Sequence, residues 1–384
     1  MKIVGLIAEY NPLHKGHQYQ LKQIRKNSQC DVLVVVMSGN VVQRGQFAVL
    51  DKWQRAQIAI DSGADFVFEL PLLASLQSAD YFAKVGIELL ALLNCSEVYF
   101  GSEQADIQTL TQFVEAVETH RAAIDQEIKA ALKTGLSYAA SYQHGIVSVL
   151  GESHFDSSLP NHQLGIQYIK ANRQLQHPML LQTIKRIKNE DGLYSATSVR
   201  EKITQGQLQS AEIPLSTWQA IQANNPVLMN DYWPLLKYQL TTLNAESLKQ
   251  IFGIKEGFEI AILNQLRWAM SWDDLVNRLT SKRWTAASVN RILIAVLGNI
   301  TDQQWHDYKT NYAQQPVIRL LAYRERHSHY LKDLRHQSVE IIANWKKDYA
   351  DHYHLQWRID QVYQLNPIKK IQDQNLTQYP IKIN

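Results

Sequence analysis

Residues 3–25 of the chain read IVGLIAEYNPLHKGHQYQLKQIR. The apolar run Ile3–Ala8 predicts a strand, and the residues from Gln18 onward have the spacing of an amphipathic helix. The turn between them contains His14-Lys15-Gly16-His17. Free N–H groups at the start of such a helix attract anions, and a glycine lets a phosphate approach the backbone closely. The stretch therefore predicts a strand, turn and helix that hold nucleotide phosphates.

The pattern His-x-Gly-His is uncommon enough to carry weight. The chain has 13 histidines and 16 glycines among 384 residues, so a random match is expected roughly 0.02 times. The alternative interpretation is a pair of solvated histidines in a turn. Because the pattern follows a predicted strand and opens a predicted helix, the phosphate-binding interpretation is favoured.

Short apolar segments and longer amphipathic segments alternate over the first hundred residues, as in a parallel sheet with crossover helices, and residues 106–150 are expected to be helical. Further strands are expected at residues 31–38, 65–70, 97–101 and 178–185, and helices at 51–62, 79–93 and 166–171. The predicted fold class is α/β, with a Rossmann-like parallel-sheet domain at the N-terminus. Ligands of such sheets bind at the carboxyl ends of the strands.

Helical patterns dominate after about residue 205. We expect helices at residues 230–240, 245–252, 258–270, 272–279, 286–297 and 329–348. A chain of this length usually forms more than one domain. The sequence therefore predicts a Rossmann-like domain over residues 1–205 and a mainly helical C-terminal domain over residues 206–384.

Composition restricts the class of protein. With 39 basic and 36 acidic residues, the net charge of +3 is too balanced to indicate nucleic-acid binding by itself. The two cysteines, Cys30 and Cys95, suggest neither a disulfide framework nor a zinc site, and no metal site is predicted. No signal peptide and no apolar run of about 18 residues is seen. We therefore expect a cytoplasmic protein with no membrane segment.

A second phosphate-binding candidate is Ser195-Ala196-Thr197-Ser198-Val199-Arg200. It offers hydroxyl groups and backbone N–H groups at a predicted helix start, with an always-charged guanidinium just inside the helix. Such a cluster suits the β- and γ-phosphates of a nucleotide. Alone, it could equally be a capped helix with a solvent-facing arginine. Its position after a Rossmann-like domain favours the phosphate-binding interpretation.

These two signatures together resemble those of nucleotidyltransferases that adenylate their substrates, and the chain most resembles the bacterial tRNA(Met) cytidine acetate ligase family. The resemblance covers residues 1–205 densely and continues thinly through 280–283 and 319–321. The segments that carry it are Val4–His17, Met37–Asn40, Gln43–Gly45, Phe68–Pro71, Phe100–Glu103, Asn161 with Leu164-Gly165, and Ser195–Arg200.

The resemblance implies an ATP-dependent ligase that forms a carbon–nitrogen bond. ATP, expected to bind with Mg²⁺, and free acetate would form acetyl-adenylate and release pyrophosphate. The acetyl group would then pass to N4 of the wobble cytidine of elongator tRNA(Met), giving N4-acetylcytidine. The domain over residues 1–205 would bind ATP, and the C-terminal domain would contribute to tRNA binding.

The resemblance also implies roles for residues. The catalytic residues would be His14, His17 and Arg200, with the histidines as hydrogen-bond donors to the α-phosphate. The ATP-binding residues would be Ile7, Ala8, Glu9, Tyr10, Asn11, Pro12, Leu13, His14, Lys15, Gly16, His17, Gln18, Tyr19, Gln20, Gly101, Asn161, Arg186, Ser195, Thr197 and Ser198.

Two further sets of residues are predicted from their positions. Ser38, Asn40, Gln43 and Arg44 follow the second strand and are candidates for binding acetate, where Arg44 could pair with the carboxylate. Lys282, Arg283, Arg319 and Arg324 are candidates for binding tRNA. The alternatives are a solvated connecting loop for the first set and solvated helix faces for the second.

Two other functions stay open on sequence alone. The chain could adenylate a small phosphorylated metabolite, as other proteins with these two signatures do. It could also be a non-catalytic RNA-binding protein that ATP regulates.

Overall fold

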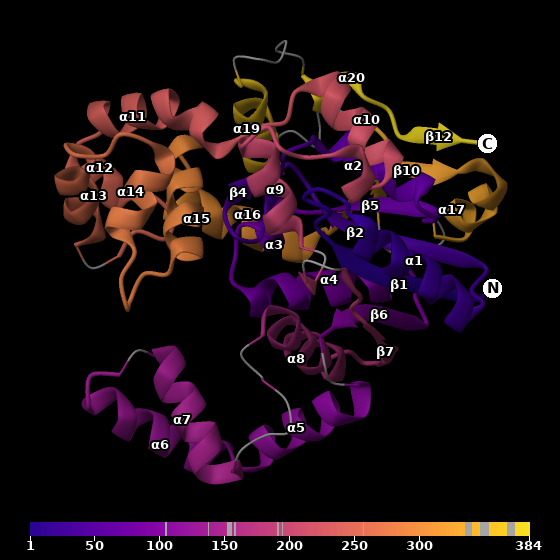
Figure 1. Ribbon diagram of the computed structural model, residues 1–384, viewed down its shortest axis with the longest axis horizontal. Helices are drawn as coiled ribbons and strands as arrows, with labels where there is room; N and C mark the ends of the chain where they lie inside the picture. Colours follow the sequence, from indigo (N-terminus) through magenta and orange to yellow (C-terminus); the bar gives the residue numbers. More distant parts are fainter. Residues whose placement is uncertain are drawn as a thin grey trace.

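The computed structural model describes residues 1–103, 106–136, 138–151, 156, 159–189, 192–193, 195–255, 257–334, 340–345, 353–366 and 373–384. Its centre is an eight-stranded sheet with the strand order β11-β10-β5-β2-β1-β6-β7, in which β12 also pairs with β10 (Figure 1). Strands β5, β2, β1, β6 and β7 run parallel, and β10 is antiparallel to β5. The strands of this sheet are β1 (Ile3–Ala8), β2 (Val32–Ser38), β5 (Phe66–Leu70), β6 (Glu97–Ser102), β7 (Leu180–Lys185), β10 (Val317–Arg324), β11 (Glu340–Ile342) and β12 (Ile381–Ile383).

Helices and two small hairpins complete the described chain. The hairpins are β3 (Val41–Val42) with β4 (Gln46–Phe47), and β8 (Lys188–Asn189) with β9 (Gly192–Leu193). The helices up to residue 204 are α1 (Lys15–Ser28), α2 (Lys52–Asp61), α3 (Leu72–Ser75), α4 (Ala79–Leu92), α5 (Ile107–Thr119), α6 (Arg121–Lys133), α7 (Tyr138–Leu150), α8 (Pro160–Arg173) and α9 (Ala196–Thr204). The later helices are η1 (Ser210–Glu212), α10 (Leu215–Asn224), η2 (Met229–Tyr232), α11 (Trp233–Thr242), α12 (Ala245–Lys249), α13 (Phe258–Leu266), α14 (Trp272–Leu279), α15 (Ala286–Leu297), α16 (Asp302–Gln314), η3 (Glu325–His327), α17 (Ser328–Leu334), α19 (His354–Gln364) and α20 (Gln374–Thr377).

Strand β2 shows why this sequence forms a sheet covered on both faces. All seven of its residues are buried, and alternate side chains of a strand point to opposite faces. Val34 and Val36 belong to the hydrophobic core that contains α4 and α8, whereas Leu33 and Val35 belong to the core that contains α1 and α2. The continuous apolar run is therefore what a central parallel strand requires.

The order of the strands places a crevice beside β1. The chain passes from β1 to β2 and β5 on one side, and later returns to β6 and β7 on the other side of β1. The carboxyl ends of these parallel strands meet where the direction of winding reverses, which is where open α/β sheets bind ligands. The predicted α/β class and its parallel strands are confirmed, and α1 begins at this point.

The C-terminal half differs from the prediction in one respect. The helices expected at 272–279 and 286–297 are present as α14 and α15, but strands β10, β11 and β12 join the main sheet. The helix expected over 329–348 is wrong, because α17 ends at Leu334 and Glu340–Ile342 form a strand; residues 335–339 and 346–348 lie outside the described residues. The division into domains at residue 205 stays a prediction.

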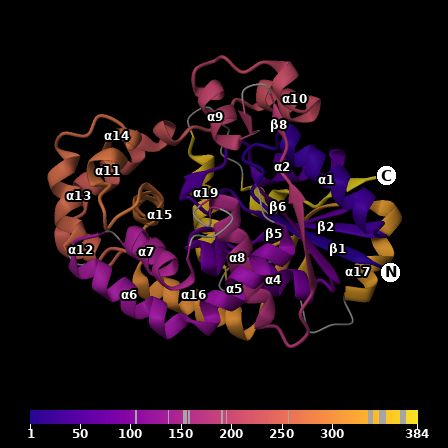
Figure 2. The same ribbon diagram turned by 60° about the horizontal axis from the view of Figure 1, so that its bottom comes forward.

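Two helical parts lie beside the sheet. Helices α11 to α15 form a group next to the β3–β4 hairpin, and α5 to α7 form an arm that extends beyond α8 (Figure 1). The second view keeps the α11–α14 group apart from the strands (Figure 2). Among the described residues, none of the helices has both the length and the apolar character needed to cross a membrane.

Candidate active site

A cavity of about 700 Å³ opens at the carboxyl ends of β1, β6 and β7. It lies at the crevice expected from the strand order, and it contains both phosphate-binding signatures. The predicted catalytic and ATP-binding residues that line it are Ile7, Ala8, Glu9, Tyr10, Asn11, His14, Gly16, His17, Tyr19, Gln20, Gly101, Asn161, Arg186, Ser195, Thr197 and Arg200.

Five residues of the predicted ATP-binding set are not among those lining the cavity: Pro12, Leu13, Lys15, Gln18 and Ser198. The backbone oxygen of Leu13 accepts a hydrogen bond of 2.9 Å from Thr217 Oγ1. Lys15 Nζ donates to the backbone oxygen of Ala211, and Ser198 is exposed on α9. Leu13 and Lys15 therefore attach the loop after β1 to α10 and to the residues before it. Their place in the motif does not reveal this role.

His14 and His17 cap helix α1 in a reciprocal arrangement. His14 is the N-cap residue, and its Nδ1 accepts a hydrogen bond of 3.1 Å from the Gly16 N–H. The Nδ1 atom of His17 accepts one of 3.3 Å from the His14 N–H. The two rings stack with their centroids 3.7 Å apart. Two orphan N–H groups of the helix start are thus satisfied by imidazoles, where Ser, Thr, Asp or Asn usually serve.

These hydrogen bonds fix the tautomer of both rings. A neutral imidazole that accepts at Nδ1 carries its proton on Nε2. Burial, together with the nearby Arg186 and Arg200 charges, lowers the pKa of His14 to about 3. Burial, His14 and Arg186 lower the pKa of His17 well below its ordinary value. At neutral pH both side chains are therefore neutral Nε2–H donors, suited to stabilise charge on a phosphate but not to transfer protons.

Arg200 connects the second signature to the first. Its Nη1 donates a hydrogen bond of 2.7 Å to the Asn11 backbone oxygen, and its Nη2 donates one of 3.1 Å to Thr197 Oγ1. Ser195 is the N-cap of α9, and its side chain accepts from the Thr197 N–H. The guanidinium therefore lies between the loop after β1 and the N-terminus of α9. Both helix starts, α1 and α9, contribute to one cavity.

Glu103 organises the opposite wall of the cavity. Its Oε1 accepts hydrogen bonds from Asn161 Nδ2 and, at 3.2 Å, from Arg186 Nη1. Its Oε2 lies 3.7 Å from Nε2 of His162, which is fully buried. No role was predicted for Glu103, although it lies within Phe100–Glu103, a segment that carries the family resemblance. One carboxylate thus orients two residues that were predicted to hold ATP.

The loop after β2 contributes only part of the predicted acetate set. Gln43 and Arg44 line the cavity, and the Gln43 N–H donates a hydrogen bond of 2.7 Å to Glu9 Oε1. Ser38 and Asn40 are buried behind the loop and are not among the lining residues. For Asn40 the reason is clear, because its side chain bonds to Asp360 Oδ1 at 2.8 Å and accepts from the Lys52 N–H at 2.9 Å.

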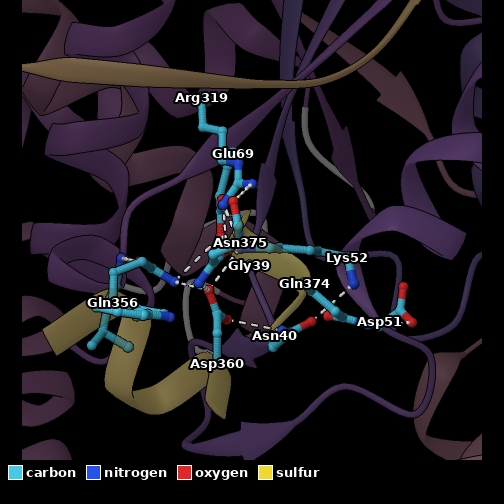
Figure 3. Close-up of polar contacts among 12 residues, drawn as sticks. Gly39, Asn40, Asp51, Lys52, Glu69, Arg319, Gln356, Asp360, Gln374 and Asn375 are labelled. Atoms are coloured by element: carbon cyan, nitrogen blue, oxygen red, sulfur yellow. Dashed lines mark hydrogen bonds and ion pairs between the residues drawn. The ribbon is translucent and has the colours of Figure 1, made fainter. Parts of the chain in front are cut away.

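Asn40 is part of a buried polar cluster behind the cavity, which Figure 3 shows in close-up. At its centre, Lys52 Nζ lies 2.8 Å from Glu69 Oε1 and 2.7 Å from Asp360 Oδ2, and all three side chains are at most 4% exposed. We call this set the Lys52 cluster; its members are Asn40, Lys52, Glu69, Arg319, Gln356, Asp360 and Asn375. It joins the segment that contains α19 and α20 to the strands and loops of the N-terminal half.

The Lys52 cluster corrects one of the predicted tRNA contacts. Arg319 is 3% exposed, donates to Asn375 and lies over the rings of Trp53 and Trp345, at 4.9 and 5.4 Å from their centroids. Its guanidinium is not available to an RNA, because packing of the sheet encloses it.

The other three predicted tRNA contacts lie on different parts of the molecule. Arg324 uses its guanidinium to bond the backbone oxygens of Ile60 and Ala64, at the opposite edge of the sheet from the cavity. Lys282 and Arg283 are exposed in the loop between α14 and α15. That loop leads into α15, whose Ala287 lines the cavity.

Several lining residues were not predicted. Phe82, Phe100, Leu164 and Tyr168 supply apolar surface. Lys185 also lines the cavity, at the strand end where the sequence predicts that Lys185 and Arg186 add positive charge to the pocket. Phe100 and Leu164 lie within segments that carry the family resemblance, so their positions were available as a signal. Phe82 and Tyr168 lie inside helices α4 and α8, where an apolar residue reads simply as core. The remaining unpredicted lining residues are Val42, Gln46, Ala79, Pro160, Gln163, Ile184, Ile187, Ala196 and Ala287.

Comparison with known proteins gives consistent results. The family model described as HIGH Nucleotidyl Transferase matches residues 1–378. The chain is 38% identical over 349 residues to the tRNA(Met) cytidine acetate ligase of Latilactobacillus sakei, covering 86% of this chain and 85% of that protein. It is 33% identical to the enzyme of the same name from Bacillus subtilis, covering 89% and 87%. The crystal structure of Thermotoga maritima TmcAL bound with alpha-thio ATP has the same fold, with a TM-score of 0.88, 24% identity and full coverage of both chains.

Proposed function

The chain belongs to the HIGH nucleotidyl transferase family and, within it, to the tRNA(Met) cytidine acetate ligases, and from this membership and the geometry of the cavity we propose the following reaction. The protein is an ATP-dependent ligase that joins acetate to a cytidine of tRNA(Met). ATP and acetate form acetyl-adenylate with release of pyrophosphate. The acetyl group then passes to N4 of the wobble cytidine of elongator tRNA(Met), giving N4-acetylcytidine.

The stacked pair His14 and His17 is the observation that carries this proposal. Attack of acetate on the α-phosphate builds negative charge on its non-bridging oxygens. Two neutral Nε2–H groups, held in place by their own hydrogen bonds at the start of α1, would stabilise that charge without reorganising. The lining residues of the loop after β1 other than Glu9, with Gly101, Asn161 and Arg186, would hold the rest of the nucleotide.

Arg200 and the N-terminus of α9 suit the departing pyrophosphate. Arg200 is always charged, and it is already placed by Asn11 and Thr197. Among the described residues, no group of three or more His, Cys, Asp or Glu side chains is arranged to hold a metal ion. Phosphates of a bound nucleotide commonly supply the ligands of Mg²⁺ together with water. We propose that ATP binds together with Mg²⁺, which would supply positive charge to the phosphates.

Acetate and tRNA would approach from the side of the loop after β2. Arg44 lines the cavity there and is a suitable partner for a carboxylate. The exposed Lys282 and Arg283 precede α15, whose Ala287 lines the same cavity. They could contact RNA phosphates while a splayed-out cytidine enters the cavity.

The proposal is tested by incubating the protein with ATP, Mg²⁺, labelled acetate and total bacterial tRNA, and digesting the RNA to nucleosides. The expected result is labelled N4-acetylcytidine, and its formation should require ATP. Pyrophosphate exchange that depends on a phosphorylated metabolite, without labelled nucleoside, would favour the small-molecule adenylyltransferase. Binding of ATP and tRNA without turnover would favour an ATP-regulated RNA-binding protein.

A further inference from the structure

Glu9 has a fixed carboxyl group in the cavity that the activation of acetate does not use. It directly follows β1 and lines the cavity. Its Oε1 accepts the 2.7 Å hydrogen bond from the Gln43 N–H. Gln43 is held in turn by two further hydrogen bonds. Its Nε2 donates to the Gln77 backbone oxygen, and its backbone oxygen accepts from Arg291 Nη1 at 3.0 Å. The carboxyl group of Glu9 is therefore turned toward the loop after β2.

The two sides of the cavity differ in what they can bind. Strand β1 lies between β2 and β6. Gly101 and Arg186, together with Asn161, line the β6–β7 side, and Gln43 and Arg44 line the β2 side. With the nucleotide on the β6–β7 side and its α-phosphate at the histidine pair, the acyl group and the incoming amine would meet on the β2 side. The Glu9 carboxyl group faces that side.

The buried guanidinium of Arg55 keeps this edge in place. It donates to the backbone oxygen of Glu9 at 2.7 Å and to that of Ser38 at 3.0 Å, and it also bonds the backbone oxygens of Gly39 and Leu50. The ends of β1 and β2 are thus tied to one cation on α2. A catalytic group needs such support, because loss of positioning by about 1 Å can be costly.

We propose that Glu9 accepts the proton that the cytidine N4 amine loses when it attacks acetyl-adenylate, an inference that rests on the proposed function. The N4 lone pair forms a bond to the acetyl carbonyl carbon. The bond from that carbon to the phosphate oxygen of AMP then breaks, and its electron pair leaves with AMP. The N4 proton passes to the Glu9 carboxylate and is later released to water. Atoms and charge balance without any further reactant.

The surroundings of Glu9 support this role. Burial raises the pKa of Glu9, while the Gln43 N–H and the charges of Arg200, Arg44 and Arg55 oppose the rise. A carboxylate of raised pKa is a stronger base. The charged and titratable groups near it are Arg200 from α9, Arg44 from the β3–β4 turn, Arg55 from α2, Tyr168 from α8, and the neutral His14 and His17 of α1.

The test separates the two half-reactions in the full-length protein. Glu9→Gln keeps an oxygen that can accept from the Gln43 N–H but cannot take up a proton. Acetate-dependent ATP–pyrophosphate exchange should fall by less than about tenfold, because the Gln amide keeps the wall of the cavity, whereas single-turnover acetyl transfer to tRNA should fall by about 10²- to 10⁴-fold. In wild type the transfer rate should fall as the pH drops through the pKa of Glu9, and Glu9→Gln should lack this dependence. Glu9→Asp, which keeps a base, should restore it in part.

Glu88→Gln is the matched control, because Glu88 is a half-exposed carboxylate on α4 paired only loosely with Lys84 at 3.9 Å. Transfer by Glu9→Gln within about threefold of wild type would overturn the inference. An equal loss of exchange and transfer would assign Glu9 a structural role and would also overturn it. Wild-type protein that exchanges no pyrophosphate with acetate would instead refute the proposed function, and the inference with it.

Discussion

His14 and His17 perform two tasks with different atoms of one ring. Each Nδ1 atom accepts a backbone N–H at the start of α1, so Nε2 of each neutral ring carries the proton that a phosphate could accept. An Asp cap would satisfy the helix but, as an acceptor only, would offer no donor to a phosphate. The motif therefore combines a local structural requirement with the chemistry of the cavity, which explains why both positions are histidine.

The two tasks can be separated by substitution. Asn is among the best N-cap residues, so His14→Asn should keep the start of α1 while removing one Nε2–H donor. We expect acetate-dependent ATP–pyrophosphate exchange to fall by about 10²- to 10³-fold, because a preorganised donor to the α-phosphate is lost. Circular dichroism should show an unchanged fold. The control is His120→Asn, a change at an exposed histidine between α5 and α6, which should leave the exchange rate intact. A His14→Asn enzyme with the wild-type exchange rate would refute the role of His14 as a donor to the α-phosphate.

The same pair predicts how stability depends on pH. Burial lowers the pKa of His14 in the folded protein to about 3, whereas an unfolded histidine titrates near 6.5. The folded state thus binds fewer protons in this range, so its stabilisation is complete above about pH 6.5 and is lost as the pH falls toward 3.

From pH 8 to pH 5, His14 alone should account for a loss of about 2 kcal/mol in the free energy of unfolding. Urea unfolding of wild type and His14→Asn at both pH values measures this contribution. The variant should lose about 2 kcal/mol less than wild type over that range. Equal losses would mean that His14 is protonated in the folded protein.

At the scale of elements, Glu103 shows how two segments distant in sequence form one wall. It follows β6 and binds Asn161 of α8 and Arg186, which follows β7. Arg186 is also bonded through its backbone N–H to the Ser102 oxygen at 3.0 Å. The β6–β7 side of the cavity, where we propose that the nucleotide binds, therefore depends on a side chain that the sequence did not single out.

Glu103→Gln should weaken ATP binding more than catalysis. The amide still accepts hydrogen bonds, but it removes the charge that holds Arg186. Loss of a charge-assisted hydrogen bond costs about 1 to 2 kcal/mol, so the KM for ATP in pyrophosphate exchange should rise by about 5- to 30-fold with a smaller change in kcat. Glu115→Gln, which breaks a comparable but exposed pair with Arg173, should change neither value. A fall in kcat with an unaltered KM would contradict this assignment.

The sequence predicted the main strands and crossover helices of the N-terminal half well, because continuous apolar runs and amphipathic segments alternate over the first hundred residues. It did not predict α3 or the hairpins β3–β4 and β8–β9. It missed β10, in which Arg319 interrupts an apolar run with the letters VIRLLAYR. A charge inside a run normally indicates an exposed face, but here Asn375 and two tryptophans enclose the arginine. The partners come from distant segments, and no local pattern contains that information.

The site itself was predicted in its motifs but not in its supports. Both signatures meet in one cavity, as the strand order requires. Glu103, Arg55 and the Lys52 cluster were missed, because each acts through contacts with segments far away in the sequence. Asn40 illustrates the difference: its position after β2 suggested a ligand-binding residue, whereas its side chain holds Asp360 of α19.

At the scale of the whole molecule, the Lys52 cluster connects the segment that contains α19 and α20 to the main sheet and to α2. Lys52 comes from α2, Glu69 from β5, Asp360 from α19 and Asn375 from α20. A Cβ at Gly39 would lie 2.5 Å from Glu69 Oε1, so the chain after β2 passes directly over the cluster. Asn40, which precedes the loop with Gln43 and Arg44, is bonded to Asp360 of α19 (Figure 3).

Lys52→Met should destabilise the whole protein, because it leaves Glu69 and Asp360 buried without their cation. Removing one partner of a buried ion pair typically costs about 3 to 5 kcal/mol, and urea unfolding of the full chain measures the loss. Lys84→Met breaks the exposed pair with Glu88 and should change stability by less than about 0.5 kcal/mol. Adding Asp360→Asn to Lys52→Met removes one of the two stranded charges, so the double variant should recover part of the loss. In Lys52→Met, amide hydrogen exchange should increase in α19 more than in α14, which lies outside the cluster. Equal protection of both helices would show that other contacts hold the segment that contains α19 and α20.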